Sequence, residues 1–228
     1  MNRRIAFLVV LFFAVLTTNA QKILFVGNSL TYYNDLPKIL EFIGEGHGVE
    51  IETKSLAFPN YALEDHLIQG ELQQEILKKY DYVIVQQGPS SQNEGKQMLL
   101  RDGATIKELC KAEKTELGFF MVWPASRHYY TFDKVIENHE LAAKTTKSLL
   151  FPVGKLWKEY NELNEKESLY GSDGFHPSKA GSFFAALVIF YELYPEKNLH
   201  QLNPAQWRQW IQDEGTFNSM VELVQNRD

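Results

Sequence analysis

The chain has 228 residues, of which 44% are hydrophobic and 13% aromatic, a composition typical of a globular protein and not of a disordered one. Its formal net charge of −6 at pH 7 argues against nucleic acid or an anionic membrane surface as a partner. The single cysteine, Cys110, cannot form an internal disulfide, and its helical setting predicts a buried, inert thiol.

Residues 1–20 have the pattern of a signal peptide. Arg3 and Arg4 supply a positive start, residues 5–16 form an apolar run, and Ala20 is a small residue at the expected cleavage position. The run is shorter than the roughly 20 apolar residues that span a bilayer. We therefore predict an exported protein, periplasmic or secreted, with no stable membrane anchor after cleavage. An uncleaved anchor is the alternative.

Residues 21–228 alternate between strand and helix patterns. Strands are predicted at residues 22–26, 49–54, 82–86, 118–123 and 149–153, and helices at 36–44, 63–79, 97–114, 132–147 and 178–193. Residues 203–228 predict one or two further helices that pack back on the domain. Such alternation predicts a single α/β domain in three layers (α/β/α), with about five parallel strands between two layers of helices.

Polar residues follow the first three predicted strands. Ser29 follows the first, Asn60 the second, and Gln86 and Gln87 the third. In a parallel sheet wound in the usual right-handed way, the segments after the strands gather at one edge, where ligands bind. The segment 173–176, just before the last long helix, can reach the same edge. We therefore expect one site at the carboxyl ends of the strands.

Three of these residues have the chemistry of a nucleophile and its base. A serine hydroxyl such as that of Ser29 needs a general base, and a histidine such as His176 suits neutral pH. Asp173 can orient the imidazole and stabilise its cation, while Pro177 disfavours helix at the histidine.

A tetrahedral intermediate also needs hydrogen-bond donors for its oxyanion. The candidates are the N–H of Ser29, an N–H near Asn60, and the side-chain amide of Gln86 or Gln87. No spacing of His, Asp or Glu predicts a metal site, and no glycine-rich phosphate loop is present in the sequence.

The segments Gly27-Asn28-Ser29-Leu30-Thr31 and Asp173-Gly174-Phe175-His176-Pro177 resemble the motifs of the SGNH (GDSL-type) hydrolases. The resemblance implies a flavodoxin-like fold for residues 21–228, no cofactor, and ester hydrolysis through an acyl-enzyme. It makes Ser29 the nucleophile, His176 the base and Asp173 its orienting partner.

This chain departs from the family pattern at three places. Asn28 stands where these enzymes more often have aspartate, and Asn60 stands at the position nearest the usual glycine of the second motif. Gln86 and Gln87 occupy the place of the third motif's asparagine. The oxyanion-hole prediction, with Ser29, Asn60 and either glutamine as donors, is therefore less direct than the triad prediction.

Aromatic residues are frequent near the predicted site, and they suit a carbohydrate substrate. Tyr61, Trp123 and Phe175 are the candidates for lining it. His66 is expected to be a packed residue and not a rival base, and His128 to lie in a surface loop. The preferred prediction is an exported serine esterase that removes short acyl groups, such as acetyl, from a carbohydrate or another small ester.

Two other functions stay open at this stage. One is a catalytically weak or inactive relative that binds a glycan or peptide in the same cleft. The other is an acyltransferase, which would use the same acyl-enzyme and differ only in the acceptor.

Overall fold

The computed structural model describes residues 20–163 and 165–226. Apart from Ala20, the predicted signal peptide lies outside the described residues. Within them, no helix combines the length and the apolar character that crossing a membrane requires.

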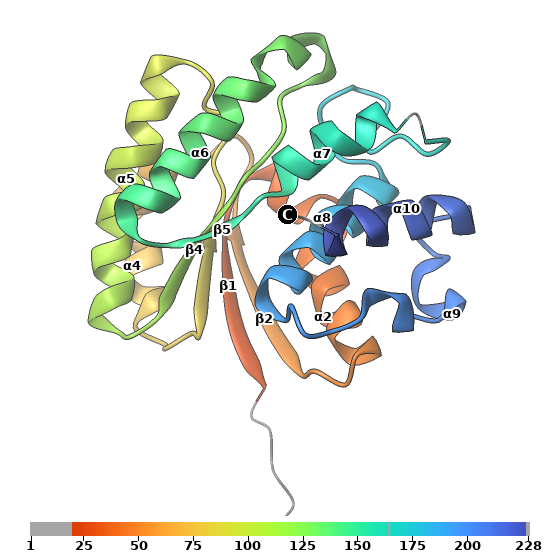
Figure 1. The fold of residues 1–228 in the computed structure, drawn as a ribbon. Coiled ribbons are helices and arrows are strands. Elements are labelled where there is room, and N and C mark those ends of the chain that lie inside the picture. The colour runs from red at the N-terminus through yellow and green to blue at the C-terminus, as the bar shows by residue number, and fades with distance from the viewer. Residues whose placement is uncertain (1–19, 164, 227–228) are drawn as a thin grey trace, which may run out of the picture.

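Five parallel strands form a single sheet in the order β2-β1-β3-β4-β5 (Figure 1). They are β1 (Gln21–Gly27), β2 (Ile51–Ala57), β3 (Tyr82–Val85), β4 (Glu116–Phe120) and β5 (Leu149–Phe151). The order reverses between β1 and β3, because β2 lies on one side of β1 and all later strands lie on the other. A flavodoxin-like sheet has this switch point, and ligands bind outside the strand ends there.

Helices cover both faces of the sheet, as the alternating pattern predicted. One face carries α2 (Leu36–Gly46), α7 (Val153–Glu162), α8 (Lys179–Leu193), α9 (Pro204–Trp207) and α10 (Glu214–Gln225); the other carries α3 (Leu63–Gln69), α4 (Glu71–Ile76), α5 (Asn93–Ala112) and α6 (Phe132–Thr146). Short turns of helix occur at α1 (Ser29–Tyr32), η1 (Tyr33–Asp35), η2 (Ser126–Thr131) and η3 (Leu199–Gln201). The three-layer α/β/α prediction is confirmed.

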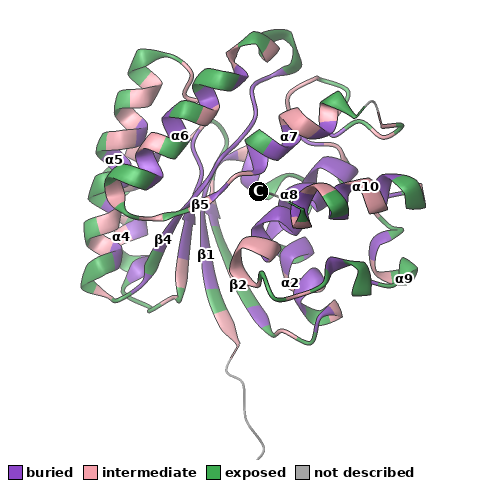
Figure 2. Cartoon of the chain, in the orientation of Figure 1, coloured by how far each residue is buried: buried purple, intermediate pink, exposed green. Residues whose placement is uncertain are grey.

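The sheet separates two hydrophobic cores. Along β1, Ile23 and Phe25 point into the core beneath α2 and α8, while Leu24 and Val26 point into the core beneath α3 and α5. Successive side chains of a strand point to opposite faces, so a continuous apolar run fills both cores. The central strands β1, β3 and β4 and the inner sides of the helices are accordingly mostly buried, whereas much of the edge strand β2 and the outer sides of the helices are exposed (Figure 2).

The helix α8 lies between the sheet and the outer helices. Every residue from Ala180 to Phe190 is buried, which explains why this segment is apolar on all sides and not on one stripe. Because α8 begins directly after the His176 segment, its packing anchors that segment to the core.

The structure differs from the predictions in several places: β2 covers Ile51–Ala57 and not 49–54, and β4 covers Glu116–Phe120 and not 118–123. The helix predicted at 63–79 is divided at Gly70, whose φ of 77° is the left-handed conformation that ends α3. The helix α5 begins at Asn93 and not at residue 97. The helix α7 was not predicted, although its packed face includes Leu156 and Trp157. Cys110 is fully buried, in agreement with the prediction.

Candidate active site

The Ser29 turn follows β1 directly, at the switch point of the sheet. Asn28 is the N-cap of α1, and its side-chain oxygen accepts a hydrogen bond from the N–H of Leu30 at 3.1 Å. Its side-chain NH₂ donates to the carbonyl of Tyr61 at 3.0 Å. One amide therefore caps the helix that begins at Ser29 and also ties it to the segment after β2. An aspartate could not make the second bond, since it lacks the donor.

Ser29, His176 and Asp173 form a continuous chain of hydrogen bonds. The His176 Nε2 lies 2.9 Å from the Ser29 Oγ, and its Nδ1 lies 2.6 Å from an Asp173 carboxylate oxygen. The second oxygen of Asp173 accepts from the backbone N–H groups of Phe175 and His176, both at 2.9 Å. A serine and a base 147 residues apart are thus within proton-transfer distance.

The same bonds set the charge of Asp173. The hydrogen bond to His176 is the largest cause, followed by the N–H of Phe175, and together with the His176 N–H they hold the pKa of Asp173 at about 2. The carboxylate is therefore ionised at neutral pH. Its bond to Nδ1 leaves Nε2 as the nitrogen that faces the serine.

A second segment, Tyr33–Asn34, holds the histidine from the other side. The Tyr33 ring stacks on the His176 imidazole, with centroids 4.6 Å apart and an angle of 19° between the planes. The Asn34 side-chain nitrogen lies 3.1 Å from the Pro177 carbonyl, 3.0 Å from the Ser178 carbonyl and 2.9 Å from the Ser182 hydroxyl. Our sequence reasoning missed this contact. The adjacent Asn34 and Asp35 were its only signal, because both residue types tolerate the left-handed backbone that they adopt here.

Two backbone N–H groups beside Ser29 are available to a ligand. Asn60 has a φ of 62°, the left-handed conformation that asparagine tolerates in place of glycine. Within the described residues, neither the Ser29 N–H nor the Asn60 N–H has a hydrogen-bond partner. Both residues line the same cavity.

The two glutamines after β3 have different surroundings. The Gln86 side chain is buried beneath the Ser29 turn, where its oxygen accepts from the Asn28 N–H at 2.9 Å and the Thr31 hydroxyl at 2.8 Å. A backbone N–H can only donate, so the Gln86 oxygen faces it, and the Gln86 NH₂ is left buried without a partner. Gln87 lines the cavity, but its NH₂ donates to the Ser90 hydroxyl and the Gly95 carbonyl.

The cavity beside Ser29 has a volume of about 400 Å³. Tyr61 and Phe175 line it, as the sequence predicted, together with Asn60 and Gln87. Trp123 does not, and this corrects the expectation that it would. Its side chain is fully buried and stacked on Trp157, and its indole N–H donates to the Phe175 carbonyl at 3.0 Å. Trp123 therefore supports the loop from below and is out of reach of a ligand.

The other candidate groups are less suited to catalysis. His66 is buried and donates from Nε2 to the Gly27 carbonyl at 2.9 Å, and burial lowers its pKa, so it supports the turn as a neutral ring. His128 is exposed in η2. Across the described residues, no group of three or more His, Cys, Asp or Glu side chains could hold a metal ion.

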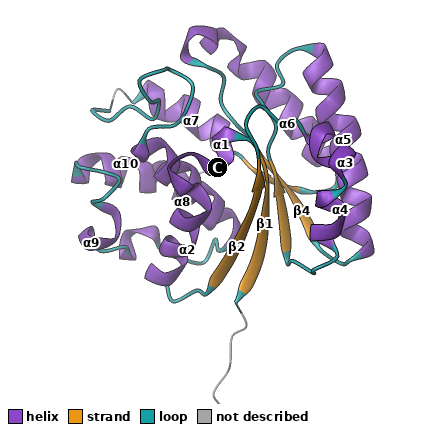
Figure 3. Ribbon diagram, turned by 180° about the vertical axis from the view of Figure 1, so that it is seen from behind, coloured by secondary structure: helices purple, strands orange, loops and turns teal. Residues whose placement is uncertain are grey.

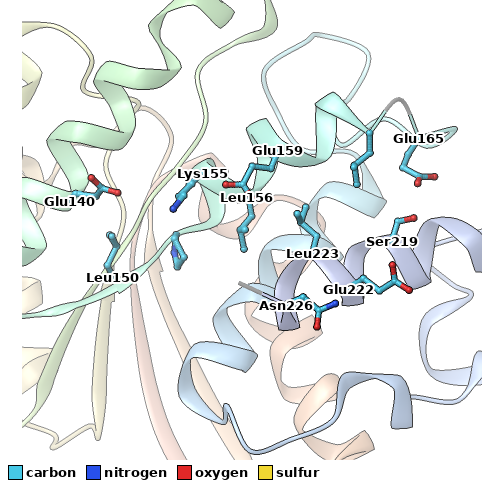
Figure 4. Close-up of a pocket in the computed structure, with 12 residues that line it drawn as sticks. Glu140, Leu150, Lys155, Leu156, Glu159, Glu165, Ser219, Glu222, Leu223 and Asn226 are labelled. Carbon is cyan, nitrogen blue, oxygen red and sulfur yellow. The ribbon is translucent and has the colours of Figure 1, made fainter. Parts of the chain in front are cut away.

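A larger cavity of about 820 Å³ lies elsewhere, between α6, α7 and α10 (Figure 4). Glutamates dominate its charged lining, with Glu140, Glu159 and Glu222 among them, and Lys155 is the one cation among the described residues that line it. Ser219 lines it, but no histidine does. The smaller cavity at the strand ends contains a serine that is hydrogen-bonded to a histidine, so it is the better candidate for chemistry. Figure 3 shows α1, which begins at Ser29, directly beyond those strand ends.

Known proteins were compared with the chain by sequence and by structure. No protein-family model and no curated sequence matches it. Among solved structures, a protein from Slackia heliotrinireducens classed as an SGNH hydrolase is 28% identical, with a TM-score of 0.65 over 77% of this chain and 100% of its own. The chain has the SGNH-hydrolase fold.

Other structures share the SGNH fold at lower identity. A DUF4886 family protein from Bacteroides uniformis is 15% identical, with a TM-score of 0.75 over 91% of this chain and 94% of its own. A catalytic mutant of an acetylxylan esterase from Geobacillus stearothermophilus is 14% identical, with a TM-score of 0.54 over 79% and 96%. At these identities the two structures bear on the fold alone. On the SGNH fold of this chain, the Ser29 turn and the Asp173–His176 loop meet at the carboxyl edge of the sheet.

Proposed function

We propose that this chain is an exported serine esterase that hydrolyses a short acyl ester, preferably acetyl on a carbohydrate, through an acyl-enzyme on Ser29. The observation that carries the proposal is the hydrogen-bonded chain from the Ser29 hydroxyl through His176 to Asp173. Export rests on the pattern of residues 1–20. The acetyl preference is part of the proposal; one structure with the same fold is described as an acetylxylan esterase.

The first half of the reaction forms the acyl-enzyme. The Ser29 Oγ attacks the ester carbonyl while the His176 Nε2 accepts the hydroxyl proton. Asp173 stays ionised and stabilises the imidazolium. The tetrahedral intermediate then collapses, the C–O bond to the alcohol breaks, and His176 gives its proton to the departing oxygen.

The second half returns the enzyme to its starting state. A water molecule attacks the acyl carbonyl, again with His176 Nε2 as the base. The new tetrahedral intermediate expels the Ser29 oxygen, which takes back the proton, and the carboxylic acid leaves. If an alcohol replaced water in this step, the product would be a new ester, which is the acyltransferase alternative.

In this mechanism the oxyanion binds to the N–H groups of Ser29 and Asn60. Both lack other partners and line the cavity, so neither has to break a bond to reach the intermediate. Gln86 holds the Ser29 turn through Asn28, and its unpaired NH₂ is a buried donor next to that turn. The Gln87 NH₂ would first have to release Ser90 and Gly95.

The test is hydrolysis of p-nitrophenyl acetate by the protein that begins at Gln21. We expect Ser29→Ala and His176→Ala to lower kcat by roughly 10³- to 10⁶-fold. Matched controls are Ser219→Ala, in the larger cavity, and His200→Ala, at an exposed position; both should keep wild-type activity. Circular dichroism checks that each variant is folded. Activity that survives Ser29→Ala would contradict the mechanism.

The competing proposal is a binding protein without catalysis. It predicts no hydrolysis of any ester by the wild type, together with saturable binding of an unmodified glycan. Measuring acetate release from acetylated xylooligosaccharides, and then binding of the deacetylated product by calorimetry, separates the two functions.

A further inference from the structure

A second cavity adjoins the one that contains Ser29. It has a volume of about 550 Å³ and lies between the start of α5 and η2. The two cavities share Pro89, Ser90, Gly95 and Phe175 in their linings, so a ligand bound beside Ser29 can extend directly into the second cavity. None of the residues that form the proposed triad lines it, and its own lining has a different character.

Arg127 gives this cavity a positive charge that nothing in the described chain neutralises. It is exposed, and it forms no ion pair or hydrogen bond. The other described arginines are both paired, Arg101 with Glu64 and Asp102, and Arg208 with Glu214. In a chain with a net charge of −6, an unpaired arginine that lines a cavity is available for an anionic ligand.

The surroundings of Arg127 do not offer it a carboxylate. No Asp or Glu lines the second cavity. Asp133, at the start of α6, forms an ion pair with Lys158, with the charged atoms 2.7 Å apart. Asp173, in the loop that approaches from the other side, is hydrogen-bonded to His176.

Next to Arg127 stands an exposed aromatic platform. The Tyr130 side chain is 82% exposed, and the His128 ring approaches it edge-on, with centroids 6.1 Å apart. Both residues line the second cavity, together with the hydroxyl-bearing Thr131. A flat apolar face beside a guanidinium and a hydroxyl suits a sugar ring that bears a carboxylate, because the planar fork of arginine binds the carboxylate with two bonds.

The geometry of catalysis indicates which part of the ester enters this cavity. His176 gives its proton to the departing alcohol, so the alcohol lies on the His176 side of the reacting carbon. Phe175, whose ring contacts the His176 ring edge-on, is part of the wall common to both cavities. Asn60, the proposed second donor to the oxyanion, lines the first cavity and not the second, which places the acyl group in the first cavity.

We propose that the second cavity binds the alcohol part of the substrate, and that this part is a carbohydrate bearing a carboxylate close to the esterified hydroxyl. Arg127 pairs with the carboxylate, and Tyr130 stacks on the sugar ring. This inference rests on the proposed esterase function, and it names the class of substrate: an acetylated oligosaccharide that contains uronic acid residues.

The test compares kcat/KM for two acetylated oligosaccharides of equal length, one of galacturonic acid and one of xylose. We expect the wild type to prefer the acidic substrate. Arg127→Gln should reduce the ratio of the two kcat/KM values by roughly 10- to 100-fold, the range of one hydrogen-bonded charge. Arg127→Lys should restore part of the ratio. Arg208→Gln, an exposed arginine elsewhere, is the matched control and should leave the ratio unchanged.

Two results would overturn the inference: a wild type that does not distinguish the substrates, or an Arg127→Gln variant that keeps the wild-type ratio. Hydrolysis of p-nitrophenyl acetate in the same preparations tests the esterase function separately. If that reaction fails, calorimetric binding of the deacetylated acidic and neutral oligosaccharides to wild type and Arg127→Gln still decides whether the cavity recognises a carboxylate.

Discussion

Replacing Asn34 tests whether a side chain far from His176 in the sequence holds that histidine in place. The Asn34 side chain lies against two carbonyls and one hydroxyl of the segment that follows His176. Its φ of 52° is left-handed, a conformation that a non-glycine residue adopts at a cost. The variants Asn34→Gly and Asn34→Ala both remove the hydrogen bonds, but only alanine retains the backbone strain.

The size of the effect follows from these contacts. An NH₂ group has two hydrogens, so it can donate to two of its three neighbours at a time. At about 0.5–1.5 kcal/mol for each bond, Asn34→Gly should lower the free energy of unfolding by roughly 1–3 kcal/mol. Asn34→Ala should lose about 1–2 kcal/mol more, because alanine is strained at positive φ. If His176 shifts by about 1 Å, kcat should fall by about 10²-fold.

The assays are urea unfolding and kcat with p-nitrophenyl acetate. Lys147 provides a matched control, since it has a φ of 51°, is exposed, and forms no hydrogen bond through its side chain. Comparing Lys147→Gly with Lys147→Ala measures the strain alone. The reasoning fails if Asn34→Gly unfolds at the wild-type urea concentration and keeps kcat within about two-fold.

Three further predictions concern the Ser29 turn and Asp173. A Cβ on Gly27 would lie 2.5 Å from the Gln86 side-chain oxygen, so Gly27→Ala should cost roughly 1–3 kcal/mol of stability in urea unfolding; a wild-type midpoint would contradict this packing. Asn28→Asp should lower kcat by roughly 10-fold or more. The carboxylate would face the Tyr61 carbonyl and displace the adjacent Asn60, whose N–H is a proposed donor to the oxyanion. Steady-state kinetics at pH 7 measure the change in kcat. The pKa of Asp173 is depressed to about 2, so its stabilising contribution is complete above its unfolded pKa of about 3.9 and is lost as the pH falls through 2. Asp173→Asn should therefore reduce the change in the free energy of unfolding between about pH 4 and pH 2. If the variant lost as much stability as the wild type over this range, Asp173 would not be the group responsible.

Local sequence patterns predicted most of the fold but not the breaks within it. The apolar runs at β3 and β4 identified buried parallel strands, because strands covered on both faces are apolar at every position. The division at Gly70 was missed, since a glycine within a helical pattern can continue the helix or end it. The helix α7 was missed although Val153, Leu156, Trp157 and Tyr160 have the i, i+3, i+4, i+7 spacing of an amphipathic helix.

The sequence by itself determined the fold class and the three residues proposed for catalysis. Alternating strands and helices specify the layered sheet, and a serine after the first strand with an Asp and a His before the last helix specifies a testable triad. Only the tertiary structure decided which side chains reach the cavity. It buried Trp123 and Gln86 and left Arg127 unpaired. The physical reason is that local periodicity shows which face of an element is buried, whereas a polar side chain can find its partner in a distant segment, as in the bond between Asn28 and Gln86, 58 residues apart.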